Sequence, residues 1–219
     1  MRIRTANHAG TQPDREQLRR IYARQFRETA QLRRHVLSLL PLHHAQTVFE
    51  PGCGSGLLGR QLKTLTDASY TGMDIDGDIL PEEDGFEQGD AVKRPLSASI
   101  CISSFFFSSV KDPVRWLKKA RTNLFAVVAE YDYQAVTEEP DAGIITRLRD
   151  SMGLHTCHGG RLDSYFLKAG FQKLHGGTVT GIPCEPDMDF LHMHLKDLPE
   201  KLPLMVWPVV WGIWKKNRR

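Results

Sequence analysis

The chain has 219 residues, of which 41% are hydrophobic, 25% charged and 9% aromatic. At roughly 100–200 residues per domain, this length fits one domain with a modest extension. The composition excludes a disordered tail, a collagen-like fibre and a disulfide-rich miniprotein. The formal net charge of +3 is too small to indicate a nucleic-acid partner by itself, and none is expected.

The cysteine pattern and the first residues of the chain indicate whether a metal site and a signal peptide are expected. The four cysteines form no C-x-x-C pair, so neither a zinc site nor a redox pair is expected, and we predict no metal. Met1–Thr5 precede no apolar run, which predicts that there is no signal peptide. The longest apolar stretch, Pro203–Trp214, is shorter than the about 20 residues of a membrane-spanning helix. Scattered, reduced thiols then indicate a cytoplasmic protein.

The first predicted element is a helix from Asp14 to Leu40, broken once, with apolar residues near a 3.6 period and arginines between them. Asp14 after Pro13 is a plausible N-cap, and Pro41 ends the run. We expect residues 1–40 to form an N-terminal helical cap or lid, and residues 41–219 a Rossmann-like domain that includes acceptor-side elements. The arginines fit either a solvated helix face or attraction to an anionic partner.

Strands and helices then alternate. The predicted strands are 46–50, 69–74, a short one near Phe86, 97–107 and 124–129, and the helices between them are 57–65 and 113–123. Such alternation implies an α/β fold with a parallel sheet and right-handed crossovers. Past Tyr133 we expect helices over 142–152 and 161–169, a hairpin arm over 171–181 and a last strand over 204–215, although Pro208 argues against a central strand there.

The strongest local signal is a glycine-rich loop between a strand and a helix, with Glu50 before Gly52, Gly54 and Gly56. Glycine permits the tight turn and lets a ligand approach the backbone, and the following helix adds unpaired N–H donors. The dinucleotide-binding fingerprint G-x-G-x-x-G requires a third glycine where Leu57 stands, so the loop does not match it. The loop also lacks the G-K-S/T of a phosphate-binding P-loop.

Two acidic residues follow at matching points of the next strands. Asp74 ends the second strand, where a carboxylate can accept both ribose hydroxyls of an adenosyl group. Asp76 and Asp78 are nearby alternatives for this role. Asp90, just past the third strand, can receive the exocyclic amino group of an adenine, and a turn aspartate is the alternative interpretation.

The ordered motifs resemble those of class I S-adenosylmethionine-dependent methyltransferases of the small-molecule type. The matching segments are Phe49-Glu50-Pro51-Gly52-Cys53-Gly54-Ser55-Gly56, Tyr70-Thr71-Gly72-Met73-Asp74-Ile75-Asp76, Gln88-Gly89-Asp90-Ala91, Val110–Leu117, Ala129–Tyr133 and Gly159–Leu162 with Lys168–Phe171. The resemblance spans roughly residues 30 to 180 and is specific for fold and cofactor, but not for the acceptor.

The resemblance implies a mostly parallel seven-stranded sheet of order 3-2-1-4-5-7-6, with helices on both faces and strand 7 antiparallel. It also implies that S-adenosylmethionine is bound, with S-adenosylhomocysteine as the product. Glu50 would hold the amino group of the cofactor. The expected cofactor-binding set is Glu50, Gly52, Cys53, Gly54, Gly56, Asp74, Ile75, Asp90, Ala91 and Ser104. Two segments depart from the family pattern: Arg121–Leu124 replaces a glycine-rich turn, and Ser103–Phe107 stands where many relatives carry a histidine or aromatic.

Acceptor residues are expected where strands 4 and 5 end, because open α/β sheets bind ligands at that edge. Ser104, Phe105 and Tyr133 are candidates there, and Tyr131, Asp132 and His155 are the predicted catalytic residues. A methyl on a sulfonium is already activated, so alignment and sometimes proton removal suffice. The strand-4 exit lacks an N/D-P-P-Y/F element, which argues against methylation of adenine or glutamine amino groups.

The sequence therefore predicts transfer of a methyl group from S-adenosylmethionine to an O, N or S atom of a small molecule. Two alternatives stay open: a non-catalytic protein that binds the cofactor, and a nicotinamide-dependent oxidoreductase. RNA or protein methylation has only the basic helix in its support. The tryptophan-rich, basic C-terminal segment is either a closing strand or a weak contact with a membrane surface.

Overall fold

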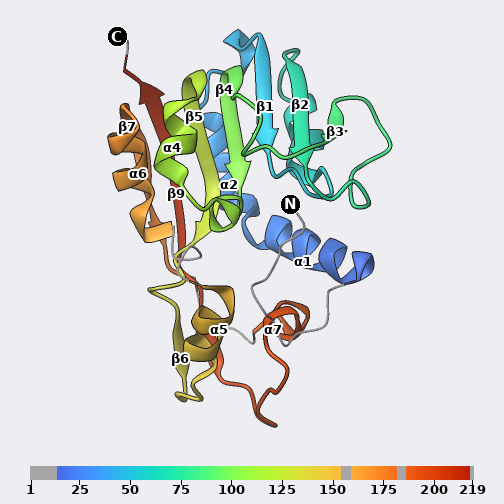
Figure 1. Cartoon of the computed structure of the whole chain (residues 1–219), viewed down its shortest axis with the longest axis vertical. Helices are drawn as coiled ribbons and strands as arrows, with labels where there is room; N and C mark the ends of the chain where they lie inside the picture. The colour runs from blue at the N-terminus through green and yellow to red at the C-terminus, as the bar shows by residue number, and fades with distance from the viewer. Residues whose placement is uncertain (1–13, 154–158, 182–185, 218–219) are drawn as a thin grey trace.

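The computed structural model describes residues 14–153, 159–181 and 186–217 (Figure 1). Its centre is a seven-stranded sheet of order β3-β2-β1-β4-β5-β9-β7. The strands are β1 (Thr47–Pro51), β2 (Ser69–Asp74), β3 (Phe86–Gln88), β4 (Ser97–Ser104), β5 (Arg121–Tyr131), β7 (Phe171–Val179) and β9 (Val209–Lys216). The first five are parallel, and β9 runs antiparallel to β5 and β7. When only the strands of this sheet are numbered, β7 is the sixth and β9 the seventh, so the predicted order 3-2-1-4-5-7-6 is confirmed.

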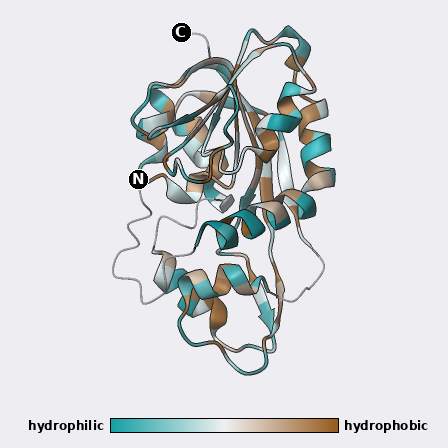
Figure 2. Ribbon diagram, turned by 90° about the vertical axis from the view of Figure 1, so that its right-hand side faces the viewer, coloured by the Kyte–Doolittle hydropathy of each residue, from teal (hydrophilic) through white to brown (hydrophobic). Residues whose placement is uncertain are grey.

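Helices cover both faces of the sheet. One face packs against α4 (Pro113–Lys118) and α6 (Leu162–Lys168), and the other against α2 (Ala30–Ser38) and α3 (Leu57–Lys63). The helices around the sheet carry both brown and teal residues in Figure 2, as expected of helices with one buried face. The two resulting apolar clusters form a three-layer core, and α2 belongs to it because Val36 is fully buried.

A third apolar cluster builds a small lobe below the carboxyl ends of the parallel strands (Figure 1). Its elements are α5 (Ile144–Met152), α7 (Met188–His194) and a two-stranded sheet of β6 (Thr137–Glu139) and β8 (Leu204–Val206). Helix α1 (Arg15–Glu28) lies between this lobe and the main sheet, and its Ile21 is buried in the cluster. Short 3₁₀ helices are η1 (Leu42–His44), η2 (Phe107–Ser109) and η4 (Gly159–Arg161).

The predicted break in the first helix is confirmed, and its cause is local. Asp14 caps α1, accepting from the Gln17 N–H at 2.7 Å, while the Gln17 side chain accepts from the Asp14 N–H. The chain leaves the α conformation at Thr29, whose hydroxyl donates to the Gln25 carbonyl oxygen at 2.7 Å, and α2 begins at the next residue.

Several element boundaries differ from the sequence-based expectation, most clearly those around strands β4 and β5. Helix α4 ends at Lys118 rather than 123, because Arg121–Asn123 already pair as strand β5 and Thr122 is buried. The expected turn before strand 5 is therefore part of that strand. Strand β4 ends at Ser104 rather than 107, because Phe105 has a φ of 51°.

The expected last strand over 204–215 is split in two. β9 is the closing antiparallel strand of the main sheet, whereas β8 pairs with β6 in the small sheet, and Pro208 lies between them, outside both strands. Trp214 is 1% exposed and stacks on Phe166 with ring centroids 4.0 Å apart. None of the helices in the described ranges has the length and apolarity that a membrane crossing requires.

Candidate cofactor and acceptor site

The glycine loop connects β1 to α3 and adopts backbone angles that only glycine takes easily. Gly52, Gly54 and Gly56 have φ values of 69°, 52° and 75°. A Cβ at Gly52 would lie 2.4 Å from Cδ2 of Phe106, and one at Gly56 would lie 2.5 Å from Cγ of Pro81. Conformation and close packing thus both require glycine here.

Glu50 lies buried at the start of this loop. Its Oε2 accepts a 2.5 Å hydrogen bond from the hydroxyl of Tyr70 on β2. Burial raises the pKa of Glu50 to about 8, the bond from Tyr70 opposes this rise, and the charge of Asp74 adds to it. A carboxyl with such a pKa favours a cationic partner, which would restore its charge.

Asp74 lies at the end of β2 and is joined directly to the glycine loop. Its Oδ2 accepts from the Gly54 N–H at 2.9 Å, and its Oδ1 accepts from the Asp76 N–H at 3.0 Å. Burial raises the pKa of Asp74, and these backbone donors oppose the rise. The structure therefore brings the two predicted binding features, the loop and the carboxylate, into contact. Cys53, within the loop, is buried, and burial raises the pKa of its thiol.

The remaining predicted cofactor residues occupy the neighbouring strand ends. Asp90 forms a turn, with Oδ1 accepting from the Val92 N–H at 3.0 Å, and Lys93 lies 3.3 Å from its Oδ2. Ala91 is buried, and its carbonyl oxygen accepts from Trp116 Nε1 at 3.1 Å. Ile75 and Ser104 are half-buried at the ends of β2 and β4. Apart from Ala91, whose side chain packs in the core, these residues border the same edge of the sheet.

A buried carboxylate that the sequence analysis missed holds the β4 exit. Glu130, 1% exposed near the end of β5, accepts from the Phe107 N–H at 2.8 Å through Oε2. Burial raises its pKa to about 8, and backbone donors around Phe107 oppose the rise. This contact fixes the turn that carries Phe105 and Phe106. The signal in the sequence that could have predicted a buried, hydrogen-bonded carboxyl here is an acidic residue inside the apolar run Val127–Tyr131.

A pocket of about 320 Å³ lies beside this exit, below β5 and under α1. Tyr131, predicted as catalytic, lines it and contacts Phe105 with ring centroids 4.6 Å apart. Burial raises the pKa of the Tyr131 phenol, and the charges of Glu28 and Asp187 raise it further. The lining residues from α1, α7 and the β9 region were not predicted, because the sequence separates them widely; they are Ile21, Arg24, Gln25, Glu28, Thr29, Asp187, Phe190, Trp207 and Val209.

Helix α1 spans both parts of the site. The Tyr22 ring lies 3.2 Å from where a Gly54 Cβ would be, and burial together with the charge of Asp74 raises its pKa. Ion pairs tie α1 to both neighbours: Arg15 pairs with Asp78 after β2, and Arg20 with Asp189 on α7 at 2.8 Å. The expected N-terminal cap thus has a helix positioned over the loop.

Of the other predicted catalytic residues, Asp132 lies apart from this pocket. Asp132 Oδ1 accepts from the Gln134 N–H at 3.2 Å, and a Cβ at Gly160 would lie 2.6 Å from its Oδ2. Asp132 is therefore a turn residue that does not line the pocket. His155 lies outside the described residues.

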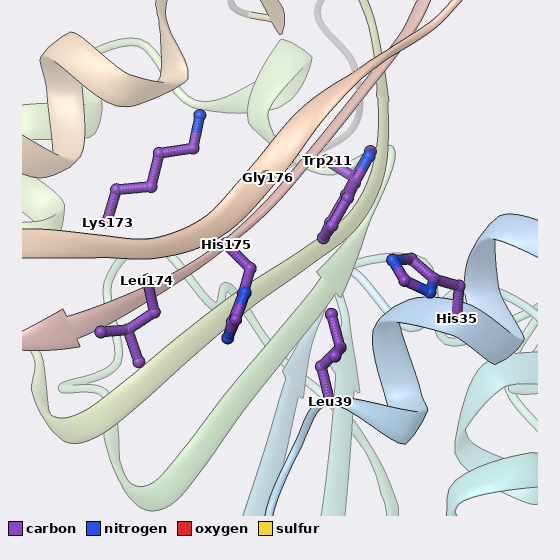
Figure 3. Close-up of a pocket in the computed structure, with 7 residues that line it drawn as sticks. All are labelled: His35, Leu39, Lys173, Leu174, His175, Gly176 and Trp211. Atoms are coloured by element: carbon purple, nitrogen blue, oxygen red, sulfur yellow. The ribbon is translucent and has the colours of Figure 1, made fainter.

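A second hollow, of about 640 Å³, lies between α2 and the edge strand β7. Figure 3 shows Trp211, His35 and His175 around it, with Lys173 on the opposite side of β7, where its Nζ bonds Asp163 at 2.7 Å. None of the predicted site residues lines this hollow.

No protein-family model and no curated protein sequence matches the chain. Solved structures do. A proposed methyltransferase from Bacillus halodurans has a TM-score of 0.59 at 12% identity, covering 86% of this chain and 99% of that one. A proposed methyltransferase solved with the Haloferax volcanii Trm112 activator has a TM-score of 0.55 at 15% sequence identity, and the match covers 94% of this chain and 98% of that one. A proposed RNA methyltransferase from Pyrococcus horikoshii has a TM-score of 0.54 at 18% sequence identity, and the match covers 88% of this chain and 84% of that one. At these identities the likeness establishes the fold: the chain has the class I methyltransferase fold.

Proposed function

We propose that the chain is an enzyme that transfers a methyl group from S-adenosylmethionine to an O, N or S atom of a small molecule. The observation that carries this proposal is the hydrogen bond from the Gly54 N–H to Asp74 Oδ2, which joins a glycine-rich loop to a half-buried carboxylate on the neighbouring strand. In an open α/β sheet this is the edge at which ligands bind.

In this proposal the chain's own residues position the cofactor. Asp74 accepts the ribose hydroxyls, Glu50 the methionyl ammonium, and the backbone of Gly52–Gly56 approaches the methionyl part. Asp90, with Ala91, faces the adenine. Ile75 and Ser104 border the bound molecule. The sulfonium brings an activated methyl group, so the protein must chiefly align the acceptor with it.

The acceptor would occupy the pocket below β5, with Tyr131 at its wall as the candidate for orienting the acceptor or moving its proton. A volume of about 320 Å³ suits a small molecule. The position of α1 above both sites supports a lid that closes on cofactor and acceptor together. Asp132 and His155 remain weaker candidates for a catalytic role.

Two rival functions differ from this proposal in what they would bind. A nicotinamide-dependent oxidoreductase is disfavoured by Leu57 in place of the third fingerprint glycine. An RNA acceptor, as in the name of the Pyrococcus horikoshii protein, would draw on exposed arginines such as Arg19 and Arg27 rather than on the pocket below β5.

Calorimetric titration with S-adenosylhomocysteine, with NADH as the control ligand, tests the proposal. We expect micromolar binding of S-adenosylhomocysteine and none of NADH. Binding of NADH alone would favour the oxidoreductase. If S-adenosylhomocysteine binds but no acceptor in a broad screen is methylated, the chain is a non-catalytic binding protein.

A further inference from the structure

The pocket below β5 has an aromatic wall built from three separate elements. Tyr131 comes from the end of β5, Phe190 from α7, and Trp207 from the turn between β8 and β9. The ring centroids of Trp207 lie 5.3 Å from Tyr131 and 5.7 Å from Phe190, and the Trp207 and Phe190 rings are nearly perpendicular. Ring faces carry negative electrostatic potential, so a cation that packs on the face of one of these rings is attracted to it.

The charged side chains of the pocket also favour a positively charged ligand. Arg24 Nε lies 2.7 Å from Glu28 Oε1, and Arg24 Nη1 lies 3.7 Å from Asp187 Oδ2. Among the described residues of the lining, these two carboxylates and the Arg24 guanidinium are the charged groups, and their charges sum to one negative charge. The neighbouring pair Arg20–Asp189 is balanced and adds nothing to this sum.

We infer that the acceptor carries a protonated amine or a quaternary ammonium group on an apolar or aromatic body. The inference rests on the proposed function, because it places the acceptor in this pocket. The apolar body would pack on Ile21, Val209 and the aromatic wall, and the cationic group would face Glu28 and Asp187. The carboxyl of Asp187 already accepts from the Phe190 N–H through Oδ1 at 3.1 Å, so its position is fixed at the start of α7.

An anionic acceptor is the opposite outcome. It would have to use Arg24, which is already engaged with two carboxylates. Binding an anion there would leave Glu28 and Asp187 facing the ligand with like charge, which is unfavourable. The sign of the preferred ligand charge therefore separates the two cases.

Three probes of nearly equal size and different charge test the inference: phenethylamine, 2-phenylethanol and phenylacetate. Each is titrated at pH 7 into the full chain saturated with S-adenosylhomocysteine, and binding is followed by calorimetry and tryptophan fluorescence. We expect phenethylamine to bind about tenfold tighter than the other two. The Trp207→Phe variant should lose most of the fluorescence change, which places the probe in this pocket.

Charge variants supply the second measurement. Glu28→Gln with Asp187→Asn keeps the side-chain shapes and the acceptor that caps α7, and should abolish the preference for phenethylamine. Asp189→Asn on the same helix, outside the pocket lining, is the matched control and should keep the preference.

Equal or tighter binding of phenylacetate or 2-phenylethanol by the wild-type chain overturns the inference, as does the absence of binding by any probe. These results come from the native chain and do not depend on whether a variant folds. Failure of S-adenosylhomocysteine to bind would instead contradict the proposed function, so the two failures are distinguishable.

Discussion

The hydroxyl of Tyr70 on β2 donates a 2.5 Å hydrogen bond to Glu50 on β1, and two glycines make room for it. A Cβ at Gly59 would lie 2.1 Å from the Tyr70 hydroxyl oxygen, and one at Gly72 would lie 2.4 Å from it. Gly59 and Gly72 lie outside the glycine loop, and their φ values are not positive. Their role is therefore steric, because they allow the phenol to reach the buried carboxyl.

Tyr70→Phe should remove this donor and leave the Glu50 carboxyl with one partner fewer in an apolar setting. We expect the pKa of Glu50 to rise further and the free energy of unfolding at pH 7 to fall by about 1–3 kcal/mol. Urea unfolding measures the loss. An unchanged midpoint would contradict the idea that Tyr70 supports Glu50.

The two buried glutamates should make the protein less stable as pH rises. Their pKa values are both raised to about 8 in the folded chain, against an ordinary value of 4.5. Between about pH 4.5 and 8 the unfolded chain loses these protons while the folded chain keeps them, so stability falls as pH rises through this window. Glu130→Gln should flatten the dependence of Tm on pH in this range.

Glu83→Gln is the control for this pH experiment. Glu83 is on the surface, and its hydrogen bond from Arg60 lowers its pKa, so it titrates below the window. The slope of Tm against pH should therefore stay that of the wild type. A wild-type slope that persists in Glu130→Gln would mean that the carboxyl is ionised in the folded chain.

Gly56→Ala should destabilise the chain more than the same change at a glycine with a similar backbone angle. Gly143 has a φ of 67° with no heavy atom within 4 Å of a new Cβ, so Gly143→Ala costs backbone strain alone, about 1–2 kcal/mol. Gly56 has a φ of 75°, and its Cβ would clash with Pro81 and Phe86, which adds about 1–3 kcal/mol. Urea unfolding compares the two variants, and equal losses would show that the loop relaxes freely.

Asp74→Ala should weaken binding of S-adenosylhomocysteine at least tenfold, by analogy with the loss of a charged hydrogen-bond partner of about 1.5–3 kcal/mol. The control is Asp76→Asn, which keeps an oxygen that can accept from the Asp78 N–H. Calorimetry measures both affinities, and circular dichroism reports whether the fold persists. An unchanged affinity of Asp74→Ala would place the ribose elsewhere.

Tyr22→Ala should speed the entry of the cofactor, because the Tyr22 ring covers Gly54 beside Asp74. Stopped-flow mixing with S-adenosylhomocysteine should show a several-fold faster association. Arg19→Ala, on the exposed side of α1, should leave the rate unchanged. Equal rates for Tyr22→Ala and the wild type would mean that α1 does not limit access.

Local sequence determined the fold class and the cofactor half of the candidate site. The loop Gly52–Gly56 needs positive φ at three positions, and the polar residue that faces it ends the next strand, so short-range patterns predict both. The sheet order followed from the resemblance and agrees with the structure. Boundaries such as the end of α4 could not be predicted, because pairing of Arg121 and Thr122 with β4 outweighs local helix preference.

Only the tertiary structure shows the pocket that we propose as the acceptor site. Arg24, Asp187 and Trp207 meet around Tyr131 only when α1, α7 and the β8–β9 turn pack on the end of β5. No periodicity links residues so far apart, since their contacts arise from burial of the third apolar cluster. In the same way, the sequence shows Glu130 only as an acidic residue in an apolar strand. Its hydrogen bond from the Phe107 N–H, which explains why it is buried, is seen only in the structure. Neighbouring residues determine the local backbone conformation, whereas the wall of a pocket depends on which distant apolar surfaces are buried against one another.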